Sequence, residues 1–187
     1  GKGTFVKWLH KIFGSKKVLE TSRPLDDVFG KFNPLMQHAF IVNLDECQKK
    51  DMIIANEEYE KMITDGWINI NTKGKNAFTM RSYHRFIITT DNDDPVQTDD
   101  DDRRNYIIRS SDELKGNIEY FKKINELIAD DWSTYSIYQY LLNLPDVPKV
   151  FNVIEFPELE YHKTIKEATR DYIDLWLEEL TREHQDN

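Results

Sequence analysis

The segment from Ala39 to Glu46 constrains the fold most strongly, because an apolar run here stops abruptly at two adjacent carboxylates, Asp45 and Glu46. A run of this length between polar residues is typical of a strand buried on both faces of a parallel sheet. The carboxyl end of such a strand is where α/β sheets bind ligands. The segment therefore predicts an α/β fold with a candidate site at its two acids. The alternative is a strand that ends in a solvated Asp-Glu turn.

The two carboxylates have distinct uses if the ligand is a nucleotide. In a nucleotide hydrolase, the first acid of such a pair holds Mg²⁺ directly or through water, and the second orients or deprotonates the attacking water. On this interpretation, we expect Asp45 to be a metal ligand and Glu46 to be a catalytic residue.

Length and composition limit the class of protein. The 187 residues suffice for one sizeable core, or for an α/β domain with a small appendage. The formal net charge of −9 argues against a generally basic nucleic-acid coat, so any contact with DNA or RNA would need a local basic feature.

The single cysteine, Cys47, excludes an intramolecular disulfide and a cysteine-based zinc site. Without an apolar stretch of roughly 20 residues or a signal-peptide pattern, we expect a soluble intracellular protein with no membrane partner.

The first four residues, Gly1-Lys2-Gly3-Thr4, precede apolar residues at helical spacing and a C-capping Gly14. Gly-Lys before an amphipathic helix is typical of the second half of a P-loop, whose backbone N–H groups cradle phosphates while the lysine contacts the β and γ phosphates. Gly3 stands where Ser or Thr is usual, which makes Thr4 the nearest hydroxyl for Mg²⁺. Because the upstream glycine and its strand are missing, we expect this chain to be an internal piece of a longer protein.

Hydrophobic periodicity and turn residues predict the remaining elements. We expect strands at 17–20, 85–90 and 106–108, a hairpin with strands at 67–71 and 77–80, and helices at 25–29, 48–64, 112–129, 133–142 and 157–183. Ser111 or Asp112 is expected to cap the helix that starts at 112. These elements divide the chain into an α/β core at residues 1–112 and a helical extension at 113–187.

The hairpin turn carries a local basic feature. Lys73 and Lys75 flank Gly74 between the two predicted strands. Lysines in such a turn usually serve only solubility, but beside a nucleotide site they become candidates for contact with a nucleic-acid backbone.

Two further polar features follow the hairpin. Asn92 lies just after the strand predicted at 85–90, where it could hold the attacking water or sense a γ-phosphate; the alternative is an Asx turn. Arg103 and Arg104 follow a run of four aspartates, which alone would indicate a local ion pair on a solvated loop. In a ring-shaped NTPase, an arginine at this position would point into the neighbouring subunit's site.

The order of these motifs resembles that of the superfamily 3 helicases of the AAA+ class, particularly the viral and phage-type primase-helicases. The resemblance covers roughly residues 1–110 and includes the Phe32-Asn33 element before the acidic strand. It implies a P-loop AAA+ fold, which is a mostly parallel sheet between helices. The first strand of that sheet would be missing from this chain, and a helical C-terminal extension would follow.

The resemblance also implies a role for each motif. ATP would bind at Gly1, Lys2, Gly3 and Thr4, and Mg²⁺ at Asp45 and Thr4. The catalytic residues would be Glu46, Asn92 and one or both of Arg103 and Arg104. DNA would bind at Lys73 and Lys75. The implied protein is a homo-hexameric ring that hydrolyses ATP with Mg²⁺ to unwind single-stranded or forked DNA. Its expected location is the cytoplasm of a bacterial or virus-infected host cell.

Two other functions fit parts of the pattern. A nucleotide kinase of the adenylate-kinase type also uses Gly-Lys-Gly-Thr, but its substrate-binding and lid arginines have no clear counterparts here. A catalytically degenerate AAA+ module that binds DNA or acts as a scaffold fits the unusual Gly3. The acids, the amide and the arginine argue against that second alternative.

Overall fold

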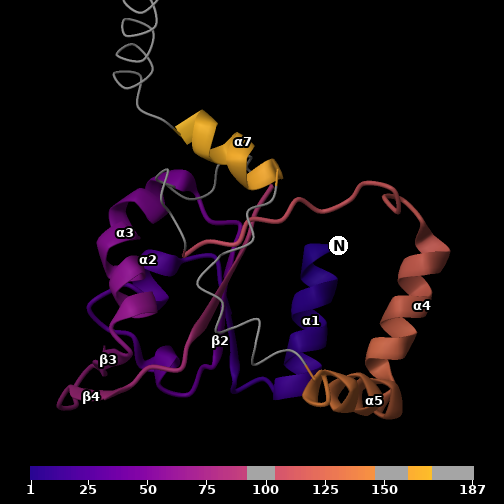
Figure 1. The fold of residues 1–187 in the computed structure, drawn as a ribbon. Helices are drawn as coiled ribbons and strands as arrows, with labels where there is room; N and C mark the ends of the chain where they lie inside the picture. Colours follow the sequence, from indigo (N-terminus) through magenta and orange to yellow (C-terminus); the bar gives the residue numbers. More distant parts are fainter. Residues whose placement is uncertain (92–103, 146–159, 170–187) are drawn as a thin grey trace, which may run out of the picture.

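The computed structural model describes residues 1–91, 104–145 and 160–169 as an α/β arrangement of helices around a small sheet (Figure 1). Its elements in chain order are α1 (Lys2–Phe13), β1 (Val18–Thr21), α2 (Pro24–Asp27), the 3-10 helix η1 (Pro34–Gln37), β2 (Ile41–Asp45), α3 (Lys49–Thr64), β3 (Trp67–Ile70), β4 (Phe78–Arg81), β5 (Arg85–Thr89), α4 (Ile118–Ala129), α5 (Asp131–Leu142) and α7 (Glu160–Thr169).

The central sheet has three parallel strands in the order β1-β2-β5, so β2 pairs on both edges. Its side chains from Ile41 to Leu44 are buried, as the apolar run predicts. The predicted α/β class and parallel sheet are therefore confirmed for this part of the chain. The AAA+ assignment and the missing first strand stay predictions.

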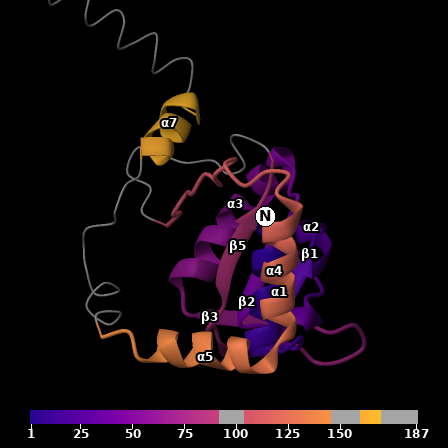
Figure 2. The same cartoon turned by 90° about the vertical axis from the view of Figure 1, so that its right-hand side faces the viewer.

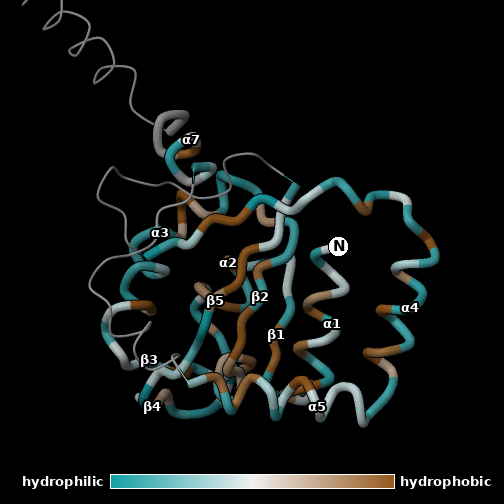
Figure 3. Tube along the Cα trace, turned by 45° about the vertical axis from the view of Figure 1, so that its right-hand side comes forward, coloured by the Kyte–Doolittle hydropathy of each residue, from teal (hydrophilic) through white to brown (hydrophobic). Residues whose placement is uncertain are grey.

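Helices cover the two faces of this sheet. On one face, Leu9 of α1 packs against Val18 and Ile41. On the other face, α2 and α3 close a larger core that contains Val42 and Leu44. Because side chains alternate along a strand, the odd-numbered residues of β2 all lie on the α1 face. Figure 3 shows hydrophobic residues concentrated in the three strands between these helices.

The hairpin predicted between residues 67 and 80 is confirmed as β3 and β4, an antiparallel pair separate from the parallel sheet. Asn33 ties the hairpin to the segment before β2. Its side chain donates to the carbonyl of Asn69 at 3.1 Å and accepts from the N–H of Asn71 at 2.9 Å. His84, just after the hairpin, is hydrogen-bonded through Nε2 to the carbonyl of Met36 at 2.8 Å.

Two predictions in the second half of the chain are wrong. Residues 106–108 do not form a strand; this segment passes α3, where Tyr59 donates to the Asn105 side chain at 2.8 Å. The helix predicted at 112–129 begins only at Ile118, because Gly116 has a φ of 82°, which a helix cannot contain. Its cap is Asn117, which accepts from the N–H of Tyr120 at 3.0 Å, and not Ser111 or Asp112.

Helices α4 and α5 pack against α1 on the side away from the sheet (Figure 2). Lys11 of α1 forms a 2.5 Å ion pair with Asp131 at the start of α5. Helix α7 lies inside the helix predicted at 157–183, and the remainder of that range is outside the described residues. None of the helices described is long and apolar enough to cross a bilayer. The predicted boundary near residue 112 stays a prediction.

Candidate nucleotide site

The N-terminus of α1 lies at the carboxyl edge of the parallel sheet. Lys2, in the first turn, reaches across so that its Nζ contacts both the carbonyl of Thr90 and the carboxylate of Asp91. Both partners follow the end of β5, which is parallel to β2. The fold therefore brings Lys2 to the edge of the sheet at which Asp45 and Glu46 also lie.

The two acids lie at the end of β2, and β5 holds both of them. Asp45 accepts a 2.6 Å hydrogen bond from the hydroxyl of Thr89, which is its partner in the strand register. The backbone N–H of Glu46 donates to the carbonyl of Thr89 at 2.8 Å. Glu46 has a φ of 50°, in the left-handed region that residues other than glycine rarely adopt. Such conformations concentrate at functional sites, where the surrounding structure maintains them.

A row of polar groups behind Asp45 was not predicted from the sequence. Asn43 is fully buried on the α1 face, and its amide donates to Glu20 of β1 at 3.4 Å. Glu20 in turn lies 3.7 Å from Nε2 of His10 on α1. A sequence signal did exist for Asn43, because a polar residue two positions before Asp45 must share its face of the strand. The pairing with Thr89 was not accessible, since it depends on strand register.

The other residues predicted to form a phosphate-binding loop lie around the start of α1. Gly1 and Gly3 are exposed, and a Cβ atom added at either position would meet nothing within 4 Å. Thr4 is half-buried beside the cavity that α1 shares with α4. The first amides of a helix lack the usual acceptor four residues back; in α1 the N–H of Thr4 bonds instead to the carbonyl of Gly1 at 3.1 Å, and the first turn contains no acidic residue. This end of α1 is therefore suited to an anion.

Of the two arginines predicted to act in a neighbouring site, the structure describes only Arg104. Its guanidinium lies 3.5 Å from the carboxylate of Glu60 on α3, and both side chains are about one-third exposed. This ion pair lies within one chain but joins Arg104 to α3; the aspartates at 99–102, the partners considered as the alternative, lie outside the described residues. Arg103 and Asn92 lie outside the described residues, so their predicted roles stay predictions.

The hairpin lysines lie between β3 and β4, which are not part of the parallel sheet that carries the acids. Lys73 and Lys75 are exposed in the turn between β3 and β4, where Gly74 has a φ of 78° and the N–H of Lys75 donates to Thr72. This hairpin precedes the amino end of β5, whereas the acids lie at the carboxyl end of the sheet (Figure 1). The structure confirms the hairpin and leaves its contact with DNA a prediction.

Two pKa shifts occur around this edge of the sheet. The hydrogen bond and charge of Lys2 hold the pKa of Asp91 below its usual value. Burial raises the pKa of the Cys47 thiol to about 11, with the charges of Asp51 and Asp45 adding to the effect. Cys47 therefore stays a neutral thiol and is not a nucleophile at neutral pH.

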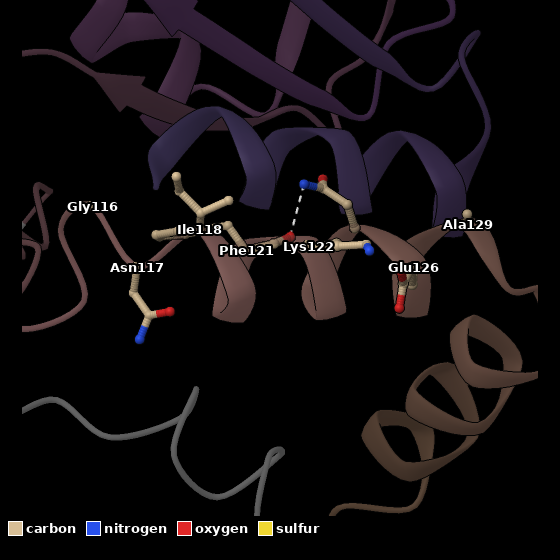
Figure 4. A pocket seen from close by; sticks show the side chains of 8 residues that line it. Gly116, Asn117, Ile118, Phe121, Lys122, Glu126 and Ala129 are labelled. Atoms are coloured by element: carbon tan, nitrogen blue, oxygen red, sulfur yellow. Dashed lines mark hydrogen bonds between the residues drawn. The ribbon is translucent and has the colours of Figure 1, made fainter.

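Two cavities lie beside the outer helices. The cavity of about 310 Å³ between α1 and α4 borders the first turn of α1; its lining is Gly1, Thr4, Phe5, Trp8, Tyr120, Phe121, Ile124, Leu127, Ile128 and Ile137. A larger one of about 640 Å³ lies along α4 alone (Figure 4), lined by Gly116, Asn117, Ile118, Phe121, Lys122, Asn125, Glu126 and Ala129. Only the first adjoins the candidate site.

Comparison with known proteins finds similarity to a phage protein and to solved structures of part of it. The chain is 27% identical over 146 residues to a protein of Nitratiruptor phage NrS-1 described as "DNA Primase-polymerase"; the match spans 76% of this chain and 18% of the relative. A solved structure described as the apo structure of the NrS-1 C terminal region (305-718) has a TM-score of 0.73 and 25% identity, and the match covers 92% of this chain and 41% of that one. A second structure of that region, the A form, has a TM-score of 0.72 and 26% identity, with 92% and 40% covered.

The chain thus spans less than half of that solved region and about a fifth of the phage protein. Residues 1–104, more than half of the 187 residues, match a protein family described as "Family of unknown function (DUF5906)". The chain therefore belongs to the DUF5906 family.

Proposed function

We propose that this chain is the ATP-hydrolysing part of a DNA helicase that acts in replication. The observation that carries the proposal is the meeting of Lys2, at the N-terminus of α1, with the strand ends next to Asp45 and Glu46. A lysine, a helix N-terminus and two acids at one sheet edge are the groups that phosphoryl transfer to water requires. Similarity to a phage primase-polymerase supports a role in DNA replication.

ATP would bind at the first turn of α1. Lys2 is about one-third exposed and contacts the largely exposed Asp91, so a phosphate can replace that carboxylate at little cost. The neighbouring cavity of about 310 Å³ borders Gly1 and Thr4 and has an aromatic lining, which suits the faces of a nucleotide base.

The residues at this edge also fit Mg²⁺. Asp45 offers a carboxylate that Thr89 orients, and Thr4 offers a hydroxyl in the first turn of α1. Within the described ranges, no three His, Cys, Asp or Glu side chains form a cluster of metal ligands. Mg²⁺ does not need one, because it binds through one or two protein oxygens, waters and substrate phosphates. Bound Mg²⁺ would neutralise phosphate charge, while Glu46 would accept a proton from the attacking water.

The DNA and assembly parts of the proposal rest on the hairpin and the arginines. Lys73 and Lys75 form an exposed positive turn on a protein of net negative charge, as a contact with single-stranded or forked DNA requires. In a homo-hexameric ring, Arg103 or Arg104 would reach the ATP of the neighbouring subunit. For Arg104, this would require release of its ion pair with Glu60.

Nucleotide titration and steady-state ATPase rates in the intact protein test the ATP site. Glu46→Gln should leave ATP binding largely intact and lower turnover about 100-fold or more, because the amide cannot accept the proton. Lys2→Ala should abolish tight ATP binding, while Lys7→Ala, which removes an exposed lysine of the same helix, should not. Wild-type binding and turnover in both Lys2→Ala and Glu46→Gln would refute the proposal. ATP binding without hydrolysis in the wild type would favour the scaffold alternative.

Salt-dependent DNA binding tests the hairpin. The double variant Lys73→Ala, Lys75→Ala should lower the slope of log affinity against log salt by about 1.4, since each single-strand phosphate contact contributes about 0.7. Basal ATPase activity should survive, because the hairpin is remote from the acids. The matched control is Lys122→Ala, Lys123→Ala, which removes another exposed adjacent pair from α4. An equal change in both double variants would remove the hairpin from the proposal.

A further inference from the structure

We infer that Thr89 is a positioning residue that fixes both acids of the candidate ATP site, Asp45 through its side chain and Glu46 through its carbonyl. The inference rests on the proposed function for its consequence in ATP binding, but the positioning itself is a property of the nucleotide-free protein.

The contact between Thr89 and Asp45 follows from the single proton that the Thr89 hydroxyl can donate. The Thr89 hydroxyl lies 2.6 Å from Oδ1 of Asp45 and 3.3 Å from Oδ1 of Asn43. Asn43 must donate its amide to Glu20, at 3.4 Å, because a carboxylate can only accept. Its oxygen therefore faces Thr89. A hydroxyl has a single proton to donate, and the shorter contact to a charged acceptor is the stronger one, so the proton points to Asp45.

The burial of these groups makes the bond effective. Thr89 is 7% exposed and Asn43 is fully buried, so water competes little for the hydroxyl. Asp45 and Thr89 are direct neighbours in the parallel register, which places the two side chains on the same face of the sheet as α1. The carboxylate is consequently held in one orientation on the α1 face of the sheet.

The backbone half concerns the turn after β2. Glu46 leaves the strand with a φ of 50°, and its N–H is held by the carbonyl of Thr89 at 2.8 Å. The next residue after β5, Thr90, gives its carbonyl to Lys2. Thr89, the last residue of β5, and Thr90, which follows it, thus contact the lysine and both acids.

The chain contains a matched control for the hydroxyl. Thr21 ends β1 as Thr89 ends β5, is also 7% exposed, and donates a 2.6 Å hydrogen bond to a carboxylate, that of Asp27. Valine at either position keeps the shape and removes the hydroxyl. The Thr21 hydroxyl also accepts from the N–H of Arg23 at 2.9 Å, so Thr21→Val should lose at least as much stability in urea unfolding as Thr89→Val, and only Thr89→Val should disturb Asp45.

The first experiment uses the nucleotide-free protein. NMR side-chain couplings of Asp45 should show one dominant χ1 rotamer in the wild type and in Thr21→Val, but rotamer averaging in Thr89→Val. Thr89→Ser, which keeps the hydroxyl, should restore the single rotamer. A single Asp45 rotamer in Thr89→Val, or equal averaging in Thr21→Val, would overturn the inference.

The second experiment measures the Mg²⁺ concentration that half-saturates ATP binding. It should rise about tenfold in Thr89→Val, consistent with the loss of a hydrogen bond to a charged group, and return to within about threefold in Thr89→Ser. Asp45→Asn serves as the reference. If Asp45→Asn raises the Mg²⁺ requirement and Thr89→Val does not, the inference about Thr89 is wrong while the ATP site stands. If Asp45→Asn has no effect, the proposed ATP site itself fails.

Discussion

Replacing Asn33 by alanine should destabilise the chain severely, although Asn33 is remote from the candidate site. Asn33 is 5% exposed, and its side chain is shared between two backbone polar groups at the end of β3. It donates to the carbonyl of Asn69 at 3.1 Å and accepts from the N–H of Asn71 at 2.9 Å, while its own N–H donates to Asn71 at 3.1 Å. Alanine removes the first two of these bonds and keeps the third.

The magnitude follows from what remains unpaired. After Asn33→Ala, the carbonyl of Asn69 and the N–H of Asn71 lose their partners, and each such buried group costs about 1–3 kcal/mol. Two fully buried groups would cost about 2–6 kcal/mol, but Asn69 is exposed and Asn71 only partly buried, so water can partly replace the lost partners; the expected loss is about 2–4 kcal/mol, a large share of the 5–15 kcal/mol typical of a folded domain. Asn33→Asp should fall between the wild type and alanine, because the carboxylate still accepts from Asn71 but repels the carbonyl of Asn69.

Urea unfolding of the wild type and the variants measures this loss. Asn69→Ala is the control, since its side chain points to solvent while its backbone carbonyl is the acceptor in question. That variant should stay within about 0.5 kcal/mol of the wild type. The reasoning is refuted if Asn33→Ala unfolds at the same urea concentration as Asn69→Ala.

Three further predictions follow from the titratable groups. Burial lowers the pKa of His84 below its ordinary 6.5, so the unfolded chain binds the proton more readily than the folded chain does. The free energy of unfolding should therefore fall as the pH drops below about 6.5. In urea titrations from pH 7.5 to 5, His84→Gln should flatten this pH dependence. Cys47, with its pKa near 11 against an ordinary 9.0, should react with iodoacetamide at pH 8 about 100-fold more slowly in the folded than in the urea-unfolded chain, and equal rates would contradict its burial. Arg104→Ala should cost under about 1 kcal/mol of stability through its ion pair with Glu60. Mixing this variant with Lys2→Ala should restore ATPase activity if Arg104 acts in a neighbouring subunit, and absence of recovery under subunit exchange would contradict that role.

The elements that the sequence predicts correctly are those whose signal is local. The apolar run of β2, the alternation of β3 and β4 and the apolar stripe of α1 each depend on residues within one segment. The segment at 106–108 has the same β-forming composition, yet Tyr106 and Ile108 are exposed and only Ile107 packs into the core. Side chains on α3 hold this segment, and such long-range pairing leaves no periodicity in the sequence.

The candidate site shows the same division. Lys2, Asp45 and Glu46 could be predicted because each stands at the boundary of a strong local pattern, and parallel strands bring their carboxyl ends to one edge. Thr89 could not be predicted, because its contact with Asp45 depends on the pairing of β2 with β5 across 44 residues of chain. A hydroxyl that orients a carboxylate on another strand leaves no pattern in the sequence around either residue.

Strand β5 connects the two regions on which the proposed function depends. It begins directly after His84, which is bonded to the carbonyl of Met36 at the base of the hairpin. It ends at Thr89, and Thr89 and Thr90 contact the acids and Lys2. Its paired neighbour β2 is buried along most of its length, and packed interiors transmit displacement more readily than they absorb it. If a bound phosphate draws Lys2 away from Thr90, the carboxyl end of β5 loses that contact. The amino end of the same strand follows the lysine hairpin, so β5 would connect the phosphate to the hairpin.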